Sequence, residues 1–402
     1  MRAPDIQNPA RQTALFLYLY ALAVAGGAVA YVPFLTILLP LRVTEIAGMD
    51  ALTILSYTAF AGAVSASLAN IGFGWASDVT RMRRPWIAAG LLLSSGLLLC
   101  VPMAHSPASL IGLIVVWQIA LNLMLAPLSA WAGDVVPDDQ KGLLGGLLAF
   151  APALGALSGA FITLHGLATA NERLYWVAAL VVLMVGPLLL FGKPVAMQHL
   201  MADNMAATPS RDAAAAAKDA VRRMWLARLL VQIAEASLFA FLLMWFRSLD
   251  PAFGENRVAS IFAFVLCAAV LFAILAGRWS DRAGRPIHPL VFAAALAAIG
   301  LVIMAFAVTM TAAIVGYVTF GVASSIFLAL HSSQTLRVLP RATRRGRDMG
   351  LFNLTNTVPS LIMPGLTLAL VPQYGFGPLF LLLAALAVAA SLLLLRTARQ
   401  PG

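Results

Sequence analysis

The residue of this sequence best placed for chemistry is Glu235, near the middle of the apolar run 224–247. An ionisable group at the midplane of a membrane is costly, and such groups commonly serve an ion or substrate pathway. Burial favours the protonated form of a carboxyl group, so Glu235 is a candidate for taking up and releasing a proton. Three roles stay open: proton coupling, contact with a substrate, or a permanently paired or protonated group within a helix bundle.

Two further polar residues share a helix face with Glu235. Gln232 and Arg228 lie three and seven residues before it, which places all three on one side of a helix with 3.6 residues per turn. Lipid would penalise such a stripe, so we expect it to face an internal cavity. Arg228 has an alternative, because a long side chain near a helix end can reach the membrane surface.

Two other polar pairs have helical spacing inside apolar runs. His331 and Gln334 are an i, i+3 pair in the run 311–336, and Gln118 and Asn122 are an i, i+4 pair in the run 108–133. His331 is either a hydrogen-bonded packing residue or part of a proton relay with Glu235.

Other kinds of chemistry find little support. Cys100 and Cys267 each stand alone in an apolar run, which predicts neither a disulfide framework nor a metal site. The chain lacks a His/Cys/Asp cluster with ligand spacing and a second midplane carboxylate, so an enzyme acting on lipids is disfavoured. It also lacks nucleotide-binding motifs, which disfavours transport driven by ATP. We therefore expect no enzyme activity, cofactor or metal.

The elements that position these residues are long apolar runs. The chain is 61% hydrophobic and only 10% charged, against roughly 25% charged in soluble domains. A bilayer core needs roughly 20 apolar residues per helix, and no run alternates with period two, so a β-barrel is not indicated. We predict an all-α polytopic membrane protein with twelve transmembrane helices. The predicted helices are 14–41, 51–76, 86–104, 108–133, 143–166, 173–192, 224–247, 257–279, 287–309, 311–336, 349–372 and 376–395.

The formal charge of +10 reflects topology rather than nucleic-acid binding. Lys and Arg gather before the first run, after the second, fourth, eighth and tenth, between the halves, and at the end of the chain. The other side carries Arg42, Arg173, Arg247 and Arg257. The positive-inside rule then places both termini and the middle loop in the cytoplasm. We expect an integral protein of the plasma (bacterial inner) membrane.

Matching landmarks about 200 residues apart predict a duplicated chain. The first copy reads Gly74-Trp75-Ala76-Ser77-Asp78 followed by Arg81, Arg83, Arg84 and Pro85, and the second reads Gly277-Arg278-Trp279-Ser280-Asp281 followed by Arg282, Gly284, Arg285 and Pro286. We predict two pseudo-symmetric six-helix bundles, 1–193 and 224–402, joined by a cytoplasmic linker, 194–223. Two similar halves can rock about a site between them.

A glycine, an aspartate four residues later and a basic cluster ending in Arg-Pro resemble the signature loop of the major facilitator superfamily. The resemblance covers the whole chain, although Arg81 stands where glycine is common. It implies a cytoplasmic gate built by the loop residues and by the ends of the fourth and tenth helices. The gate residues so implied are Gly74, Asp78, Arg81, Arg84, Asp134, Gly277, Asp281, Arg282, Arg285 and Arg337.

The same resemblance places the first, fourth, seventh and tenth helices around a central cavity, to which we add two asparagines of the eleventh. These asparagines could instead hold helices together. The predicted cavity residues are Tyr20, Tyr31, Thr36, Gln118, Asn122, Arg228, Gln232, Gln334, Asn353 and Asn356, with Glu235 and His331 for proton coupling.

Short loop segments, 133–142 and 339–353, are similar to the branch that contains sugar–cation symporters and sucrose carriers. The sequence therefore predicts a secondary active transporter of a small polar organic solute, glycoside- or sugar-like, working by alternating access and coupled to protons. The glycine- and proline-containing stretch 146–159 faintly resembles drug–proton antiporters. The alternative is therefore proton-antiport export of amphipathic drugs or siderophore-like compounds. The expected partners are a small-molecule solute, protons and membrane lipid, without nucleic acid, and the chain is expected to function as a monomer.

Overall fold

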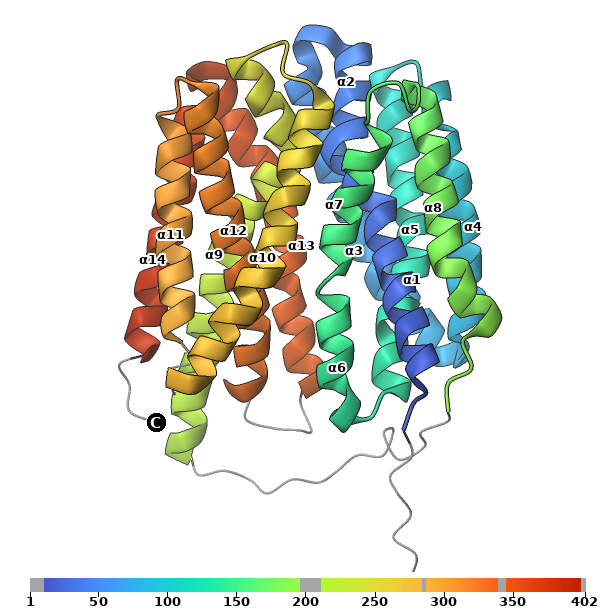
Figure 1. Ribbon diagram of the computed structural model, residues 1–402, viewed down its shortest axis with the longest axis vertical. Coiled ribbons are helices and arrows are strands. Elements are labelled where there is room, and N and C mark those ends of the chain that lie inside the picture. The colour runs from blue at the N-terminus through green and yellow to red at the C-terminus, as the bar shows by residue number, and fades with distance from the viewer. Residues whose placement is uncertain (1–10, 196–210, 284–286, 339–344, 399–402) are drawn as a thin grey trace, which may run out of the picture.

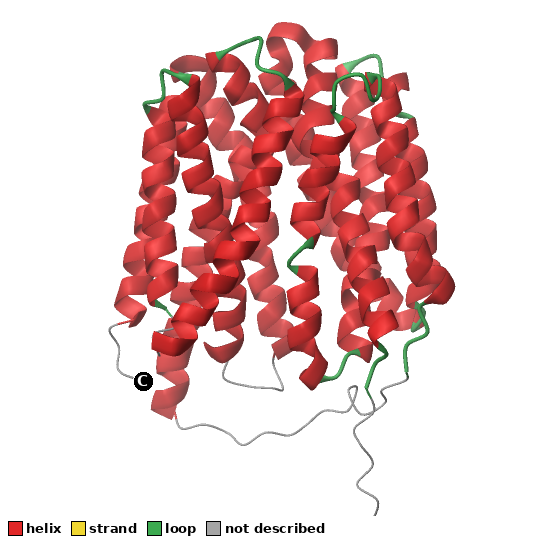
Figure 2. Ribbon diagram, in the orientation of Figure 1, coloured by secondary structure: helices red, strands yellow, loops and turns green. Residues whose placement is uncertain are grey.

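The computed structural model describes residues 11–195, 211–283, 287–338 and 345–398, and within these ranges every regular element is a helix (Figure 2). The first part of the chain contains α1 (Ala14–Pro33), the π-helical turn η1 (Phe34–Leu38), α2 (Leu39–Ala47), η2 (Gly48–Asp50), α3 (Ala51–Thr80), α4 (Arg83–Leu99), η3 (Val101–Met103), α5 (Pro107–Val135), α6 (Asp138–Leu148), α7 (Ala151–Ile162) and α8 (Ala170–Phe191). The second part contains α9 (Arg211–Leu249), α10 (Glu255–Ala283), α11 (His288–Ala305), α12 (Met310–Val338), α13 (Arg345–Tyr374) and α14 (Phe376–Ala398).

Most of these helices have the length and apolarity of membrane spans. Nine stretches of the described residues can cross a membrane by length and composition, and the first of them, Ala14–Thr80, contains two of the predicted runs. The remaining two predicted runs coincide with α4, which has 17 residues, and with α13, which contains three prolines. Each predicted run therefore overlaps a helix.

The helices pack as two groups that follow chain order (Figure 1). In the first group α1 packs against α7 and α8, and α5 packs against α3 and α4; in the second, α11 packs against α12 and α14, and α9 against α12, α13 and α14. Contacts between the groups are made mainly by α7 with α10 and by α3 with α13. Helix α9 begins at Arg211, so it extends into the segment 194–223 predicted as linker, of which 196–210 lie outside the described residues.

Two spans of the first group are interrupted. A π-helical turn follows Pro33 in the first span, where proline removes a backbone hydrogen bond and crowds the preceding turn. The fifth span breaks at Ala149 and Phe150, between α6 and α7, and α7 has Pro152 in its first turn. Proline-induced breaks of this kind let a span bend beside a binding site.

Glycine allows the closest helix contact in each group. A Cβ at Gly90 of α4 would lie 2.3 Å from the backbone nitrogen of Met124 in α5, and one at Gly300 of α11 would lie 2.4 Å from that of Phe320 in α12. Both distances are shorter than any real contact, so only glycine fits. In both groups, a glycine therefore permits close packing of the corresponding helix pair.

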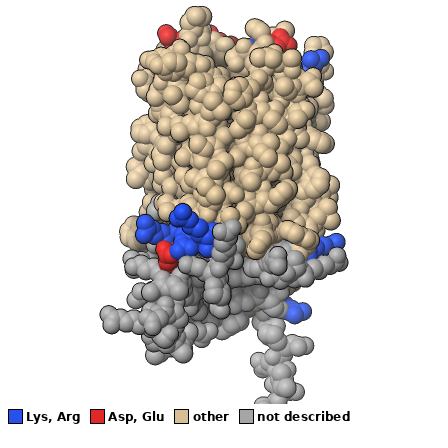
Figure 3. All heavy atoms as spheres, turned by 90° about the vertical axis from the view of Figure 1, so that its left-hand side faces the viewer, with Lys and Arg blue, Asp and Glu red and all other residues tan. Residues whose placement is uncertain are grey.

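The two ends of the helical bundle differ in charge (Figure 3). Lys and Arg gather at one end, called here the basic end, where α1 begins and α3 turns into α4. The other end, called the opposite end, holds α2, η3, the start of α8 and the turn between α9 and α10. Between the ends the visible surface is almost free of charge, as a lipid-facing surface requires.

Candidate functional site

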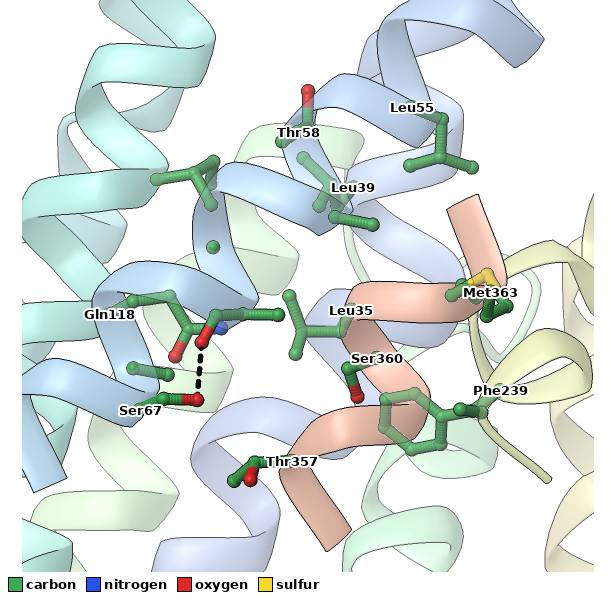
Figure 4. Close-up of a pocket in the computed structure, with 17 residues that line it drawn as sticks. Leu35, Leu39, Leu55, Thr58, Ser67, Gln118, Phe239, Thr357, Ser360 and Met363 are labelled. Carbon is green, nitrogen blue, oxygen red and sulfur yellow. Dashed lines mark hydrogen bonds between the residues drawn. The ribbon is translucent and has the colours of Figure 1, made fainter. Parts of the chain in front are cut away.

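A cavity of about 240 Å³ lies between the two helix groups, about halfway along the bundle. Both groups build its wall, as Figure 4 shows with Leu35 and Gln118 on one side and Phe239 and Ser360 on the other. The first group contributes Leu35, Leu39, Leu55, Thr58, Ala59, Gly62, Ala63, Ala66, Ser67, Ile114 and Gln118, and the second contributes Ala236, Phe239, Ala240, Thr357, Ser360 and Met363.

Among the lining residues that the structure describes, the polar groups are hydroxyls and one amide, and all of these residues are uncharged. Thr58 and Ser67 donate their own hydroxyl protons to the carbonyls of Ile54 (2.6 Å) and Ala63 (2.7 Å) one turn earlier. Their oxygens therefore remain available only as acceptors. Gln118 adds an amide with both donors and an acceptor. The wall suits a neutral ligand that carries hydroxyl donors.

An aromatic group borders the cavity in the second half. The ring of Phe239 lies 6.3 Å from the ring of Tyr31 in α1 and 6.3 Å from that of Phe262 in α10. These rings connect both helix groups across the cavity wall. A flat apolar face of a ligand can pack against Phe239 while its hydroxyls reach the polar side.

Gln118 and Asn122 lie together, as their spacing predicted, but only Gln118 reaches the cavity. Asn122 is buried one turn away, where it donates to the Gln118 carbonyl (2.9 Å) and accepts from Asn70 of α3 (3.2 Å). Asn70, Ser67 and Thr58 escaped prediction because α3 was not assigned to the cavity. The available signal was that these three small polar residues recur along an otherwise apolar run.

Tyr20 and Thr36, which we predicted in the cavity, lie outside its lining. The Tyr20 hydroxyl donates to the Leu128 carbonyl (2.6 Å), which fastens α1 to α5. Thr36 is buried in the π-helical turn and donates to the Val32 carbonyl (2.7 Å). Tyr31 contacts the cavity wall only through Phe239. These residues were placed by helix number, which does not fix the face that each side chain presents.

Glu235 lies beside the cavity on α9, adjacent to the lining residue Ala236, and its carboxylate accepts a hydrogen bond from Ser324 of α12. The Ser324 hydroxyl also lies 3.2 Å from the Gly321 carbonyl. Glu235 is therefore directed into the second helix group rather than into the cavity. Gln232 and Arg228 are partly buried on the same helix, nearer the basic end.

His331 is buried on α12 and does not meet Glu235. Its Nε2 lies 2.9 Å from the carbonyl oxygen of Met224, and its ring lies 5.5 Å from that of Phe327. Met224 is eleven residues before Glu235 on α9, which is roughly 16 Å along a helix axis. His331 and Glu235 are therefore not in direct contact, and the proton-relay role of His331 stays a prediction.

At the basic end, Arg83 joins the two predicted gate acids of the first half. Its guanidinium donates to Asp134 at the end of α5 (2.9 Å), to Asp78 and to Ser77. We had predicted Arg81 and Arg84 instead. Arg81 ends α3 with φ of 52°, a conformation that favours glycine, and it is exposed. Arg84 lies over the Trp131 ring, 5.6 Å from its centroid.

Gly74 is partly buried on α3, four residues before Asp78. The remaining predicted gate and cavity residues lie where the structure describes no side chains. These are Gly277, Asp281, Arg282, Gln334, Arg337, Asn353 and Asn356, together with Arg285, whose backbone also lies outside the described residues.

At the opposite end, polar side chains cross between the helix groups, which the sequence did not predict. Glu255 at the start of α10 accepts from Arg173 of α8 (3.2 Å) and from Arg247 of α9 (3.3 Å). The adjacent Asn256 donates to the Ala160 carbonyl (2.9 Å) and to the Thr163 hydroxyl (3.1 Å) of the first group. Charged and neutral hydrogen bonds therefore join the two helix groups at the opposite end.

Two helix groups around a central cavity closed at one end define the fold of a membrane transporter. The crystal structure of the human organic anion transporter MFSD10 (TETRAN) is similar over 94% of this chain and 99% of that chain, with 13% identity and a TM-score of 0.66. The crystal structure of a mutant of the nucleoside transporter NupG is similar over 96% of this chain and 100% of that chain, with 13% identity and a TM-score of 0.70.

Residues 224–402 match the family model of the Major Facilitator Superfamily. No curated protein sequence matches the chain. This match supports the resemblance to the major facilitator superfamily that the loop signature predicted, and the predicted all-α polytopic membrane fold is confirmed. The protein is therefore an integral membrane protein with the fold of a secondary transporter.

Proposed function

We propose that this protein moves a small, neutral, hydroxylated organic solute across the membrane by alternating access, coupled to protons. The observation that carries the proposal is the uncharged cavity shared by both helix groups. Its volume of about 240 Å³ is below the roughly 300–1,000 Å³ of sites for drug-sized ligands. Glycosides and sugars, which the loop segments favour, have the size and hydroxyl donors that this wall accepts.

The absence of charge among the described lining residues argues against an ionic solute. An ion taken from water into an apolar cavity without a partner loses several kcal/mol or more of hydration. A neutral solute instead needs only its hydroxyls matched, and Thr58, Ser67 and Gln118 provide acceptors and an amide. Of the two substrates named for the similar structures, the nucleoside of NupG has this chemistry and the organic anion of MFSD10 does not.

Proton coupling is assigned to Glu235. Its carboxylate shares a hydrogen bond with Ser324, while Ala236 and Phe239 on the same helix line the cavity. A rotation of α9 that accompanies solute binding would change the contact between Glu235 and Ser324. Protonation of Glu235 is then linked to occupancy of the cavity through one helix.

The orientation that we propose follows the positive-inside rule, with the basic end in the cytoplasm. Both termini then lie in the cytoplasm, and the membrane is a plasma membrane, such as the bacterial inner membrane. The state described here is closed on the outer side by Glu255 and Asn256. The chain contains both halves of the cavity, which supports a functional monomer.

Proton-antiport export of amphipathic compounds is the second candidate. It is favoured by the mainly apolar wall, in which leucine, alanine and Phe239 outnumber the polar residues. An amphipathic ligand could pack its apolar part on this wall without hydroxyl donors. The two candidates differ in the direction of coupled proton movement.

The test is internal pH in sealed proteoliposomes that contain the full chain, followed with a trapped dye. Sugars, glycosides, nucleosides, siderophores and cationic drugs are added outside in turn. Acidification on addition of a neutral hydroxylated solute supports symport, and alkalinisation on addition of an amphipathic drug supports antiport. A chain that moves labelled solute without any pH change contradicts the coupling.

The Glu235→Gln variant sharpens this test. We expect it to abolish the solute-driven pH change while keeping exchange of labelled solute between equal concentrations, because exchange needs no net proton movement. The matched control is Glu172→Gln, since Glu172 is an exposed helix-capping residue and glutamine retains the capping bond. A pH change in Glu235→Gln equal to that of the control would remove Glu235 from the coupling step.

A further inference from the structure

A second cavity, of about 280 Å³, lies at the opposite end and is separate from the central one. Its floor is apolar and buried, with Phe34 and Leu38 from the π-helical turn and Leu174 from α8. Its rim is exposed and polar, with Glu45 and Asn171 among the lining residues. We name it the outer pocket. Phe34 and Leu38 face it, whereas Leu35 and Leu39 face the central cavity.

The charged groups of the outer pocket are fixed in place by hydrogen bonds. Arg42 donates to Glu45 (2.9 Å) and to the carbonyls of Pro102 (3.0 Å) and Ala104 (2.9 Å). Arg173 donates to Glu255 across the boundary between the helix groups (3.2 Å). Side chains held this way lose little further freedom when a ligand binds.

Two arginines share one carboxylate at this pocket. Glu45 pairs with Arg42, but Glu255 is shared between Arg173 and Arg247, so three arginines meet two glutamates. The nearby Glu172 is exposed, accepts from the Thr169 backbone N–H at 2.7 Å, and forms no ion pair with these arginines among the described residues. In addition, the Nε–H groups of Arg42 and Arg173 are buried without an acceptor among the described residues.

We propose that the outer pocket binds a small organic carboxylate. The ligand carboxylate pairs with Arg173 and replaces Glu255 in that ion pair. Glu255 then pairs with Arg247 alone, and Arg42 stays paired with Glu45. Each charged group then has one partner. The apolar part of the ligand rests on Phe34 and Leu38. Guanidinium and carboxylate groups form strong paired hydrogen bonds, which suits this exchange. This site is distinct from the proposed transport site and does not depend on it.

Binding has a consequence for the closed end. The Arg173–Glu255 bond joins the two helix groups, whereas the bonds in the liganded pocket each lie within one group. Occupancy by a carboxylate therefore weakens the closure. A ligand that binds the open state better shifts the population toward that state.

The test uses purified full-length protein in detergent, with thermal unfolding followed at constant ionic strength. The probe is benzoate, and its neutral counterpart benzamide is the ligand control. A saturable rise of Tm with benzoate alone is expected, because a ligand that binds only the folded state stabilises it by mass action. Each variant is compared with its own Tm in the absence of ligand.

Two variants are expected to move the apparent Kd in opposite directions. Arg173→Gln removes the pairing group and should weaken benzoate binding at least ten-fold. Glu255→Gln removes the competing carboxylate and should tighten it several-fold. The control is Arg257→Gln, an exposed arginine of the same end that lies over Phe253 and does not line the pocket; its Kd should not change. If Arg173→Gln does not fold, Arg173→Lys should give a smaller loss.

Three results would overturn the proposal. The first is an equal Tm shift with benzoate and benzamide, which shows binding through the ring alone. The second is weaker binding in Glu255→Gln, because a purely structural role of the ion pair predicts a loss in both variants. The third is a loss in Arg257→Gln as large as that in Arg173→Gln, which indicates general attraction to a basic surface.

Discussion

The two ends of this protein use charged residues in opposite ways. At the opposite end, Glu255 and Asn256 of the second helix group reach Arg173, Ala160 and Thr163 of the first. At the basic end, the described contacts of Arg83 with Asp78 and Asp134 stay within the first group. Among the described residues, the opposite end joins the two groups and the basic end stiffens the first of them.

Gln12 shows the same behaviour at the basic end. This buried glutamine, just before α1, donates to the carbonyls of Val135 (2.7 Å) and Val195 (2.7 Å) and accepts from the Val195 backbone N–H (2.9 Å). Gln140 completes the cluster by exchanging bonds with the Gln12 backbone. All of these partners belong to the first group. The rigid first-group part of the basic end can therefore move away from the second group as a unit. The contacts at the opposite end hold the two groups together during this movement.

Of three substitutions that test this difference between the ends, Glu255→Ala should have the largest effect on access from the opposite end. Without this carboxylate, Arg173 and Arg247 face each other across the boundary, and repulsion should open the opposite end. Breaking a partly buried ion pair costs on the order of 1–3 kcal/mol. We expect at least ten-fold faster labelling of Ser360→Cys by an impermeant maleimide added at that end, in a Cys100→Ser, Cys267→Ser background. Unchanged labelling would show that the pair does not hold the closure.

Gln12→Ala should lower stability without opening the opposite end. The substitution leaves the Val195 N–H and two carbonyls without their partner, which costs about 1–3 kcal/mol in total. Thermal unfolding should show a lower Tm, and the Ser360→Cys labelling rate at the opposite end should stay within two-fold. Faster labelling in Gln12→Ala would mean that the basic end also controls the closure.

Asn256→Ala should have the smallest effect of the three. Its two bonds across the boundary are neutral, and a neutral hydrogen bond contributes about 1 kcal/mol. The same labelling assay should therefore show an acceleration of about three- to five-fold. Combination with Glu255→Ala should give less than the product of the single effects, because neighbouring residues of one contact are coupled. Fully additive effects in the double variant would show that Asn256 and Glu255 act independently on the closure.

The places where prediction worked depend on local properties of the chain. The length of each apolar run predicts a helix wherever it occurs, because a span must cross a bilayer of fixed thickness. The spacing of Gly74 and Asp78 predicted the family, which the match over 224–402 supports. The position of Gln118 in the cavity followed from the family resemblance, which places its helix beside the cavity.

The places where prediction failed depend on which face a helix presents. Tyr20 and Thr36 were expected in the cavity, but both side chains bond to backbone carbonyls instead. His331 and Glu235 lie on neighbouring helices at different depths. Their residue types suggest a proton relay but carry no information on the distance between them.

The amino-acid sequence alone was enough to predict a helical membrane protein, and it also predicts a duplicated chain with a carboxyl group near the midplane. Hydrophobic length, charge distribution and repeats are properties of single segments, which need no knowledge of their neighbours. Only the tertiary structure decided that Glu235 bonds to Ser324, 89 residues away, and that Glu255 bonds to Arg173, 82 residues away. Those partners are chosen by the packing of helices, and packing depends on the shapes of all the side chains between them.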